Sequence, residues 1–243
     1  EFDEVRAYAA GDDVRAIDWR VTARSGTAHT KLFHEDREQP ILVAIDQRTP
    51  MKFGSTQCFK SVMAAHVGTL ALWSALGAGE RVGGVVLGDN SLSDTRPKRS
   101  QHSVLRVIGD LVHEGAPNVD DNAPSNDLSD LLQQLERIAR PGTRIFLISD
   151  FHDLLEADNF SPLRRLARRT QLVGIAVNDR LEAELPRSGH YSVTDGNHHS
   201  SLDTGADTIR EAYASQYRSN QELTARRLRE LRIPLLKIST GDD

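Results

Sequence analysis

The chain has 243 residues, enough for one large α/β domain or two small ones, and its single cysteine, Cys58, excludes an intrachain disulfide and a cysteine-based zinc cluster. A formal net charge of −5 and an aromatic content of 5% exclude the basic, ring-rich surface of a typical nucleic-acid-binding protein. No run of about 18 apolar residues occurs, so the chain contains no candidate membrane-spanning helix.

The first 38 residues are rich in charge and follow neither the helical nor the strand period, which predicts an irregular N-terminal segment. Residues 40–46, "PILVAID", form a short apolar run with β-branched side chains, which is typical of a strand buried on both faces. The apolar period of residues 56–79 then predicts a helix that ends at Gly77 and Gly79.

A second strand is predicted at residues 81–89, "RVGGVVLGD", where the glycines indicate that a neighbouring backbone approaches closely. Two amphipathic helices follow, at residues 102–115 and 127–140, separated by a polar loop at residues 116–126. Further strands are predicted at residues 143–150, 170–179 and 233–240, and further helices at residues 161–170 and 207–231.

The alternation of strands and helices predicts an α/β fold with a doubly wound, mostly parallel sheet and right-handed crossovers. We expect one main domain at residues 39–243, with the segment at residues 1–38 packed on it as an elaboration. In such sheets, ligands bind outside the carboxyl ends of the strands. Asp46 and Asp150 each follow an apolar strand directly, so we expect both carboxylates at the same rim of the sheet.

The opening stretch "VRAYAAGDDVRAIDWRVTAR" is similar to the signature of a bacterial family, domain-of-unknown-function family number 58, in which R-x-Y-x-x-G-D-x-x-R-x-I-D-W is followed by A-R. The later stretches "AIDQRTPMKFG" and "LISDF" occur in the order of that family, and the resemblance spans essentially the whole chain. It implies a von Willebrand factor A-like fold. The matching residues are Arg6, Tyr8, Gly11, Asp12, Arg15, Ile17, Asp18, Trp19, Ala23 and Arg24.

The signature segment combines opposite charges at short spacing. This predicts an internal network of ion pairs and hydrogen bonds that holds the segment against the sheet, with Trp19 as its apolar anchor. The alternative is a surface for partner docking or regulation.

Domains of the von Willebrand factor A-like type normally carry a metal-ion-dependent adhesion site. The resemblance implies that Asp46 and Asp150 occupy its two acidic positions, whereas Arg48 and Pro50 stand at the two serine positions and Asn126 at the threonine position. Three of the five ligand positions therefore depart from the pattern, which implies a degenerate metal site.

Arg48 brings a permanent positive charge to this rim, and Pro50 offers no side-chain oxygen. We expect the guanidinium of Arg48 to point inward, to bridge the carboxylates of Asp46 and Asp150, and to exclude a divalent ion. The alternative places Arg48 in solvent, with a weakly bound Mg²⁺ held by the two aspartates and water.

No nucleophile with an identifiable base occurs in the sequence. The resemblance implies a non-enzymatic protein-interaction module that works with a MoxR-type AAA+ ATPase, or with its client, in chaperone-like maturation of protein complexes. The expected interaction rim consists of Asp46, Arg48, Asn126 and Asp150, and a carboxylate of the partner would bind Arg48 directly.

Two other functions stay open: a metal-dependent phosphoesterase that uses Asp46, Asp150 and Asp153, and a structural scaffold with a vestigial rim. We expect no nucleic-acid partner and a cytoplasmic domain. The sequence begins in mid-pattern without Met, so we also expect a further N-terminal portion, where a membrane anchor is compatible with the sequence.

Overall fold

The computed structural model describes residues 2–33, 39–115, 126–155, 157–186, 189–194 and 199–241. The chain divides into two compact units, which we call unit 1 (residues 1–38) and unit 2 (residues 39–243). The predicted packing of the first on the second stays a prediction.

Unit 1 is built on a two-stranded antiparallel ribbon, in which β1 (Phe2–Ala7) pairs with β2 (His29–Phe33). The connection between the strands carries a short 3-10 helix, η1 (Val14–Ala16), and the helix α1 (Trp19–Ser25). The expectation of an irregular segment is therefore wrong. These elements are short and rest on polar caps and turns, so no apolar period marks them in the sequence.

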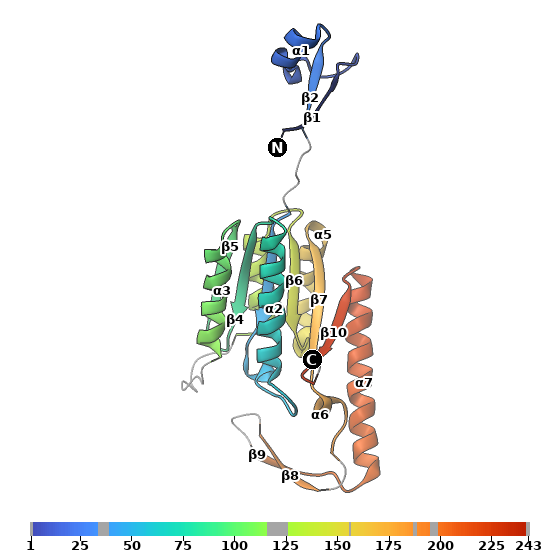
Figure 1. The fold of residues 1–243 in the computed structure, drawn as a ribbon. Coiled ribbons are helices and arrows are strands. Elements are labelled where there is room, and N and C mark those ends of the chain that lie inside the picture. The colour runs from blue at the N-terminus through green and yellow to red at the C-terminus, as the bar shows by residue number, and fades with distance from the viewer. Residues whose placement is uncertain are drawn as a thin grey trace. The chain divides into compact units, whose positions relative to one another are not determined.

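The main sheet of unit 2 has six strands within the described residues, in the order β10-β7-β6-β3-β4-β5 (Figure 1). Neighbouring strands are parallel except for β5, which runs antiparallel to β4. Numbered along the chain, the order is 3-2-1-4-5-6, which is that of a doubly wound sheet. The predicted α/β fold class is therefore confirmed. The strands are β3 Ile41–Asp46, β4 Val82–Leu87, β5 Leu92–Lys98, β6 Arg144–Ser149, β7 Gln171–Asn178 and β10 Leu235–Ser239.

Helices cover both faces of this sheet. Leu72 of α2 packs in one core with Val43 of β3, whereas Leu132 of α4 packs in the opposite core with Leu42. Because successive side chains of a strand point to opposite faces, both cores bury β3 along its whole length. The long helix α7 runs beside β10 (Figure 1). The helices are α2 Lys60–Gly77, α3 Gln101–Glu114, α4 Leu128–Ile138, α5 Ala157–Arg169, α6 Arg180–Ala183 and α7 Asp207–Glu230.

The structure contains strands of unit 2 that the sequence patterns did not predict. The edge strand β5 is polar and includes Pro97, which an edge tolerates because it needs neither a complete hydrogen-bond ladder nor two apolar faces. The strands β8 (His190–Thr194) and β9 (His199–Asp203) form an antiparallel hairpin. Of the predicted polar loop at residues 116–126, all but Asn126 lies outside the described residues. None of the described helices has the length and apolarity needed to cross a bilayer.

Gly83 of β4 confirms the predicted close approach of a neighbouring backbone. A Cβ atom built at this position would lie 2.3 Å from the carbonyl oxygen of Thr95 in β5. We expect Gly83→Ala to lower the free energy of unfolding by ~1–3 kcal/mol, because β5 must move away from β4. Urea denaturation measures this effect. The control is Gly109→Ala on α3, where a Cβ meets nothing within 4 Å, and an equal loss in both variants would contradict the interpretation.

Candidate functional site

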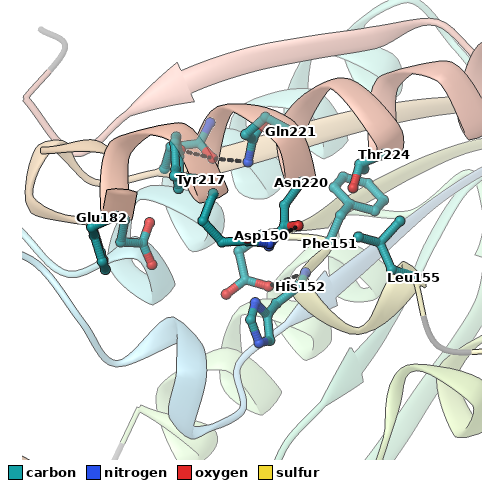
Figure 2. A pocket seen from close by; sticks show the side chains of 12 residues that line it. Asp150, Phe151, His152, Leu155, Glu182, Tyr217, Asn220, Gln221 and Thr224 are labelled. Atoms are coloured by element: carbon teal, nitrogen blue, oxygen red, sulfur yellow. Dashed lines mark hydrogen bonds between the residues drawn. The ribbon is translucent and has the colours of Figure 1, made fainter. Parts of the chain in front are cut away.

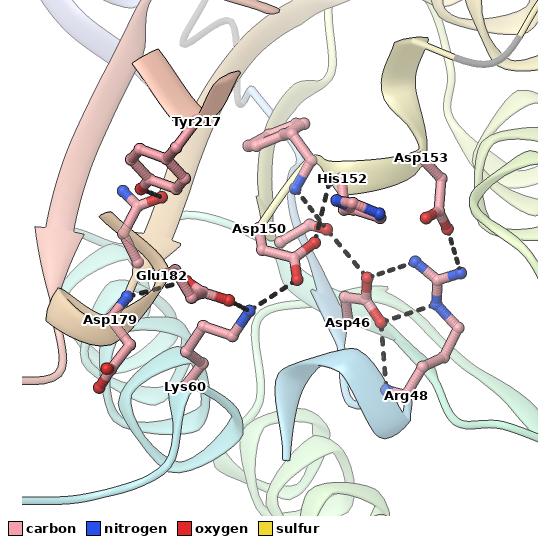
Figure 3. A network of polar contacts seen from close by, with 12 residues as sticks. Asp46, Arg48, Lys60, Asp150, His152, Asp153, Asp179, Glu182 and Tyr217 are labelled. Atoms are coloured by element: carbon pink, nitrogen blue, oxygen red, sulfur yellow. Dashed lines mark hydrogen bonds and ion pairs between the residues drawn. The ribbon is translucent and has the colours of Figure 1, made fainter. Parts of the chain in front are cut away.

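The predicted acids lie at one rim of the main sheet, as Figure 3 shows. Asp46 is the last residue of β3 and Asp150 directly follows β6, and these strands are parallel neighbours. The hydroxyl of Ser149 donates to Oδ2 of Asp46 at 2.9 Å and so links the two strand ends. Asp46 is only 1% exposed, so its carboxylate is a buried charge that requires a partner.

Arg48 is the partner of Asp46. Its Nε and Nη2 donate to the two carboxylate oxygens of Asp46, at 2.9 and 2.7 Å, and its Nη1 donates to Oδ2 of Asp153 at 2.5 Å. Burial acts to lower the pKa of Arg48, but the hydrogen bonds and negative charges of the two aspartates outweigh burial and raise this pKa. The guanidinium therefore points inward and is permanently charged.

The predicted bridge from Arg48 to Asp150 is wrong. Asp150 pairs instead with Lys60 at the start of α2, whose Nζ lies 2.8 Å from Oδ2 of Asp150 and 2.5 Å from Oε1 of Glu182. The guanidinium group of Arg48 already pairs with Asp46 and Asp153. The first turn of α2 brings a second cation, Lys60, to the end of β6. Each strand-end acid therefore has its own resident cation.

Lys60 is a site residue that reasoning from the sequence missed. Its side chain is 1% exposed, and lysine is almost never buried to that extent without an acidic partner. A lysine in the first turn of an otherwise apolar helix was the available signal. Burial acts to lower the pKa of Lys60 and to raise that of Asp150, but their mutual attraction reverses both effects. The pKa of Lys60 is raised and that of Asp150 is lowered, so the pair is ionised at neutral pH.

The turn after β6 orients Asp150. The backbone N–H of His152 donates to Oδ1 of Asp150 at 3.0 Å, and that of Phe151 donates to Oγ of Ser149 at 3.1 Å. Phe151 has a φ of 57°, a left-handed conformation that is strained for an aromatic residue. Its side chain is buried, and this packing together with the two hydrogen bonds holds the strained turn in place.

The other predicted ligand positions have structural roles at the same rim. Asn126 lies against the turn between β4 and β5, where its amide nitrogen donates to two backbone carbonyl groups at 3.1 and 2.9 Å. It makes no described contact with the strand-end acids. Pro50 lies in a short 3-10 helix, η2 (Thr49–Met51), and Thr49 donates through its backbone and its hydroxyl to Asp89.

This donor set does not fit a divalent metal ion. A hard cation needs carboxylate and hydroxyl oxygens that are free to coordinate it. The oxygens of Asp46 and Asp150 instead accept charge-assisted hydrogen bonds from Arg48 and Lys60. Among the residues that the structure describes, no group of three or more histidine, cysteine or acidic side chains converges on one point. That this rim binds no metal stays a prediction, and the geometry supports it.

The same geometry disfavours a three-carboxylate catalytic centre. Asp46 and Asp153 meet at Arg48, whereas Asp150 meets Glu182 at Lys60 (Figure 3). These are two separate charge centres, and neither presents three acids around an open space, as metal-dependent phosphoester cleavage requires.

A pocket of about 270 Å³ opens beside Asp150 and against α7 (Figure 2). On its wall, Tyr217 and Gln221 donate to the amide oxygen of Asn178, both at 3.2 Å. Burial, with the negative charge of Glu182 adding to it, raises the pKa of Tyr217 to about 12, so its hydroxyl stays a donor. The remaining lining residues are Phe151, His152, Leu155, Glu182, Tyr213, Gln216, Asn220 and Thr224.

The signature segment forms a polar network inside unit 1. Arg6 pairs with Oδ1 of Asp12 at 2.6 Å, and the backbone N–H of Ala9 donates to Oδ2 at 2.9 Å. These contacts, the backbone bond first, lower the pKa of Asp12. Gly11 has a φ of 112°, which only glycine adopts without strain, and Asp18 caps α1 through its side chain.

Other signature residues lie at the surface of unit 1. The hydroxyl of Tyr8 donates to a backbone carbonyl at 3.3 Å, whereas Arg15 in η1 and Arg24 in α1 are exposed. The ring of Trp19 is 68% exposed, so it does not form the core of its own unit. Its predicted role as an anchor on the sheet stays a prediction.

Residues 4–223 match the family described as protein of unknown function DUF58, and the chain belongs to this family, as its signature predicted. It is 29% identical over 247 residues to the uncharacterized proteins Rv1480 of Mycobacterium tuberculosis and Mb1516 of Mycobacterium bovis. Each alignment covers 99% of this chain and 74% of the relative.

Solved structures with a similar fold include conserved hypothetical protein BatB from Bacteroides thetaiotaomicron, at 12% identity and a TM-score of 0.49, covering 84% of this chain and 91% of that one. The SpRpn10 VWA domain is 13% identical with a TM-score of 0.45, covering 84% and 90% of the two chains. The strand order of the main sheet fits the von Willebrand factor A-like fold that the family resemblance implies. The chain is thus a domain of unknown function whose architecture is compatible with a protein-interaction module.

Proposed function

We propose that this chain is a non-enzymatic, cytoplasmic interaction module, an adaptor that works with a MoxR-type AAA+ ATPase in the maturation of protein complexes. One observation carries the non-catalytic part: Asp46 and Asp150 are each neutralised by a resident cation. A carboxylate whose oxygens accept such charge-assisted bonds is poorly available as a metal ligand or a general base. The AAA+ partner is proposed from the family resemblance of the signature segment.

The charge of the rim favours a basic partner surface. Beside the pocket, Asp150 and Glu182 both pair with the single cation Lys60, so this centre has one more carboxylate than cations within the described residues and keeps a net charge of −1. Such a field attracts a cationic surface, and salt screens the attraction.

A basic partner surface takes the place of the partner that the sequence predicted, whose carboxylate would bind Arg48. The side chain of Arg48 is only 7% exposed, and its Nε, Nη1 and Nη2 all donate to aspartates. A carboxylate approaching from outside would have to displace a buried ion pair, which is strongly unfavourable. We therefore correct that expectation.

The pocket beside Asp150 provides a place for a side chain of the partner. The carboxylates of Asp150 and Glu182 each have lone pairs besides those that accept from Lys60, and a lysine or arginine supplies the matching donors. Tyr213, which lines the pocket and is 38% exposed, offers an aromatic face for a cation. The pocket therefore suits a basic anchor residue.

The test measures binding of the purified chain to the MoxR-type ATPase of the same organism, with nucleotide present. The variant Tyr213→Ser removes the aromatic face of the pocket and keeps every member of the two buried ion pairs. We expect its affinity to fall on the order of tenfold or more, because anchors in desolvated pockets dominate such interfaces. Binding of the wild type is expected to weaken as salt is raised.

The matched control is Tyr191→Ser. Tyr191 is 39% exposed, close to the exposure of Tyr213, and lies outside the pocket on the β8–β9 hairpin. Full binding by the Tyr213→Ser variant would overturn the pocket as docking site. Absence of wild-type binding would overturn the AAA+ partner and favour a scaffold with a vestigial rim.

A further inference from the structure

A second cavity of about 310 Å³ lies in unit 2 at the opposite edge of the sheet, where the parallel strands begin. Four arginines from different elements line it: Arg81 precedes β4, Arg96 lies in β5, and Arg137 and Arg140 lie at the end of α4 and just after it. No acidic side chain belongs to its described lining. Such a cluster of positive charges is unexpected in a chain whose net charge is −5.

The arginines of this cavity lack acidic partners in the described part of the chain. Arg81 donates to the backbone carbonyl of Pro97, and Arg137 donates to the amide oxygen of Gln134, so both partners are neutral. The side chains of Arg96 and Arg140 form no hydrogen bond or ion pair with any described residue. Four like charges around one cavity repel one another, and an anion placed among them removes that repulsion.

The acid nearest in sequence to the end of α4 is already engaged. Glu136 forms a bidentate pair with Arg165 of α5, at 2.7 and 2.9 Å. Its hydrogen bond to Arg165 holds its pKa below the usual value, so it stays ionised and paired. Among the described residues, Arg144 at the start of β6 donates to the amide oxygens of Gln39 and Gln171. Asp94 of β5 accepts from the amide of Gln134 at 3.0 Å and does not belong to the described lining of the cavity.

We propose that this cavity, the arginine pocket, binds a ligand through one or two phosphoryl groups. A phosphoryl group carries about −1.5 to −2 charge at neutral pH and offers three acceptor oxygens, which match several guanidinium forks at once. A single carboxylate would leave most of the positive charge uncompensated. The described lining contains no aromatic ring on which a nucleobase could stack, so the phosphoryl group is the recognised part.

The arginine pocket is separate from the rim that carries the proposed docking function. The six-residue strand β3 lies between the two edges, and a strand of that length spans roughly 20 Å. Among the residues that the structure describes, none lines both sites. A test of the phosphoryl site is therefore independent of a test of the interaction rim.

The experiment titrates the full chain with inorganic pyrophosphate in a calorimeter at low salt. We expect saturable binding. In the variant Arg96→Gln/Arg140→Gln the affinity should fall on the order of tenfold or more, because two of the four guanidinium groups are lost. Arg20→Gln/Arg226→Gln is the matched control, since it removes the same charge from α1 and α7, outside the cavity. Binding equal in wild type and pocket variant, or absent in the wild type, would overturn the site.

A second readout is thermal denaturation with and without pyrophosphate. Without ligand, the pocket variant is expected to melt at or above the wild-type temperature, because like-charge repulsion is reduced. With pyrophosphate, only the wild type and the control are expected to gain stability. A gain in the pocket variant as large as in the wild type would contradict the proposal.

A parallel titration uses a phosphoserine peptide and a glutamate peptide, which is the same sequence with glutamate in place of phosphoserine. It distinguishes the source of the phosphoryl group. Binding of pyrophosphate alone indicates a free phosphorylated metabolite, and binding of the phosphopeptide indicates a phosphorylated protein segment. Both results support a phosphoryl site. If the glutamate peptide bound as tightly as the phosphoserine peptide, the ligand would be an acidic peptide and the proposed phosphoryl ligand would be overturned.

Discussion

Replacing Lys60 by methionine is expected to lower the free energy of unfolding of unit 2 by about 3–5 kcal/mol at neutral pH, because it leaves a buried carboxylate without its cation. The side chain of Asp150 is only 9% exposed, so water compensates for the lost ammonium group only in part. A loss of this size is a large part of the stability of a typical domain, which is about 5–15 kcal/mol. Urea denaturation of the variant and the wild type measures it.

The stability of the Lys60→Met variant is expected to change with pH in the opposite direction to that of the wild type. In the wild type the pKa of Asp150 lies below its usual value of 3.8, so the stability from the pair is lost only as pH falls below that value. Without Lys60, burial dominates and raises the pKa of Asp150 above that value. The Lys60→Met variant should therefore gain stability as pH is lowered from 7 towards 5, since protonation removes the buried charge.

Two comparisons make this result specific. Lys52→Met on the same rim removes a partly exposed pair with Asp89 and should cost no more than ~1 kcal/mol. The double variant Lys60→Met/Asp150→Asn should lose less than Lys60→Met alone, because the orphaned charge is gone. Equal losses in the Lys60 and Lys52 variants would show that Lys60 is not the cation that Asp150 requires.

Replacing Arg48 by serine is the second change with a large expected effect. It removes both the bidentate partner of Asp46 and the link to Asp153, and we expect a loss of about 3–5 kcal/mol at neutral pH. The backbone N–H at position 48 and the hydroxyl of Ser149 still donate to Asp46, so the rim keeps part of its hydrogen bonding. Thermal and chemical denaturation both report this loss.

The same variant tests whether the guanidinium excludes a divalent ion. In Arg48→Ser, the oxygens of Asp46 and Asp153 lose their cation and gain a serine hydroxyl two residues after Asp46. We expect Mn²⁺ to recover stability in this variant, by about 2.7 kcal/mol at 100 times its dissociation constant. The wild type is expected to show no response. Mn²⁺ stabilisation of the wild type, saturating at micromolar concentration, would contradict the proposed replacement of metal by Arg48.

Arg144→Ser is the matched control for this experiment. Arg144 lies at the other end of β6 and donates only to neutral amide oxygens, so its loss should cost about 1 kcal/mol and create no response to Mn²⁺. A response in both serine variants would indicate nonspecific binding of the ion to the acidic surface.

The main elements of unit 2 were predictable because buried strands and amphipathic helices leave local patterns in the chain. The strand at Ile41–Asp46 is apolar along its whole length since helices cover both faces of the sheet. The ribbon of unit 1 and the edge strand β5 were not predictable in this way. Their stability rests on turns, caps and a single paired neighbour, none of which imposes an apolar period.

The sequence by itself placed Asp46 and Asp150 at one rim, because parallel strands end at the same edge of their sheet. It also showed that Arg48, two residues after Asp46, stands where a small hydroxyl would suit a metal. Only the tertiary structure decided which cation serves which acid. Arg48 reaches Asp153 across 105 positions of the chain and Lys60 reaches Asp150 across 90, and such pairings depend on distance in space, which the spacing of residues along the chain does not determine.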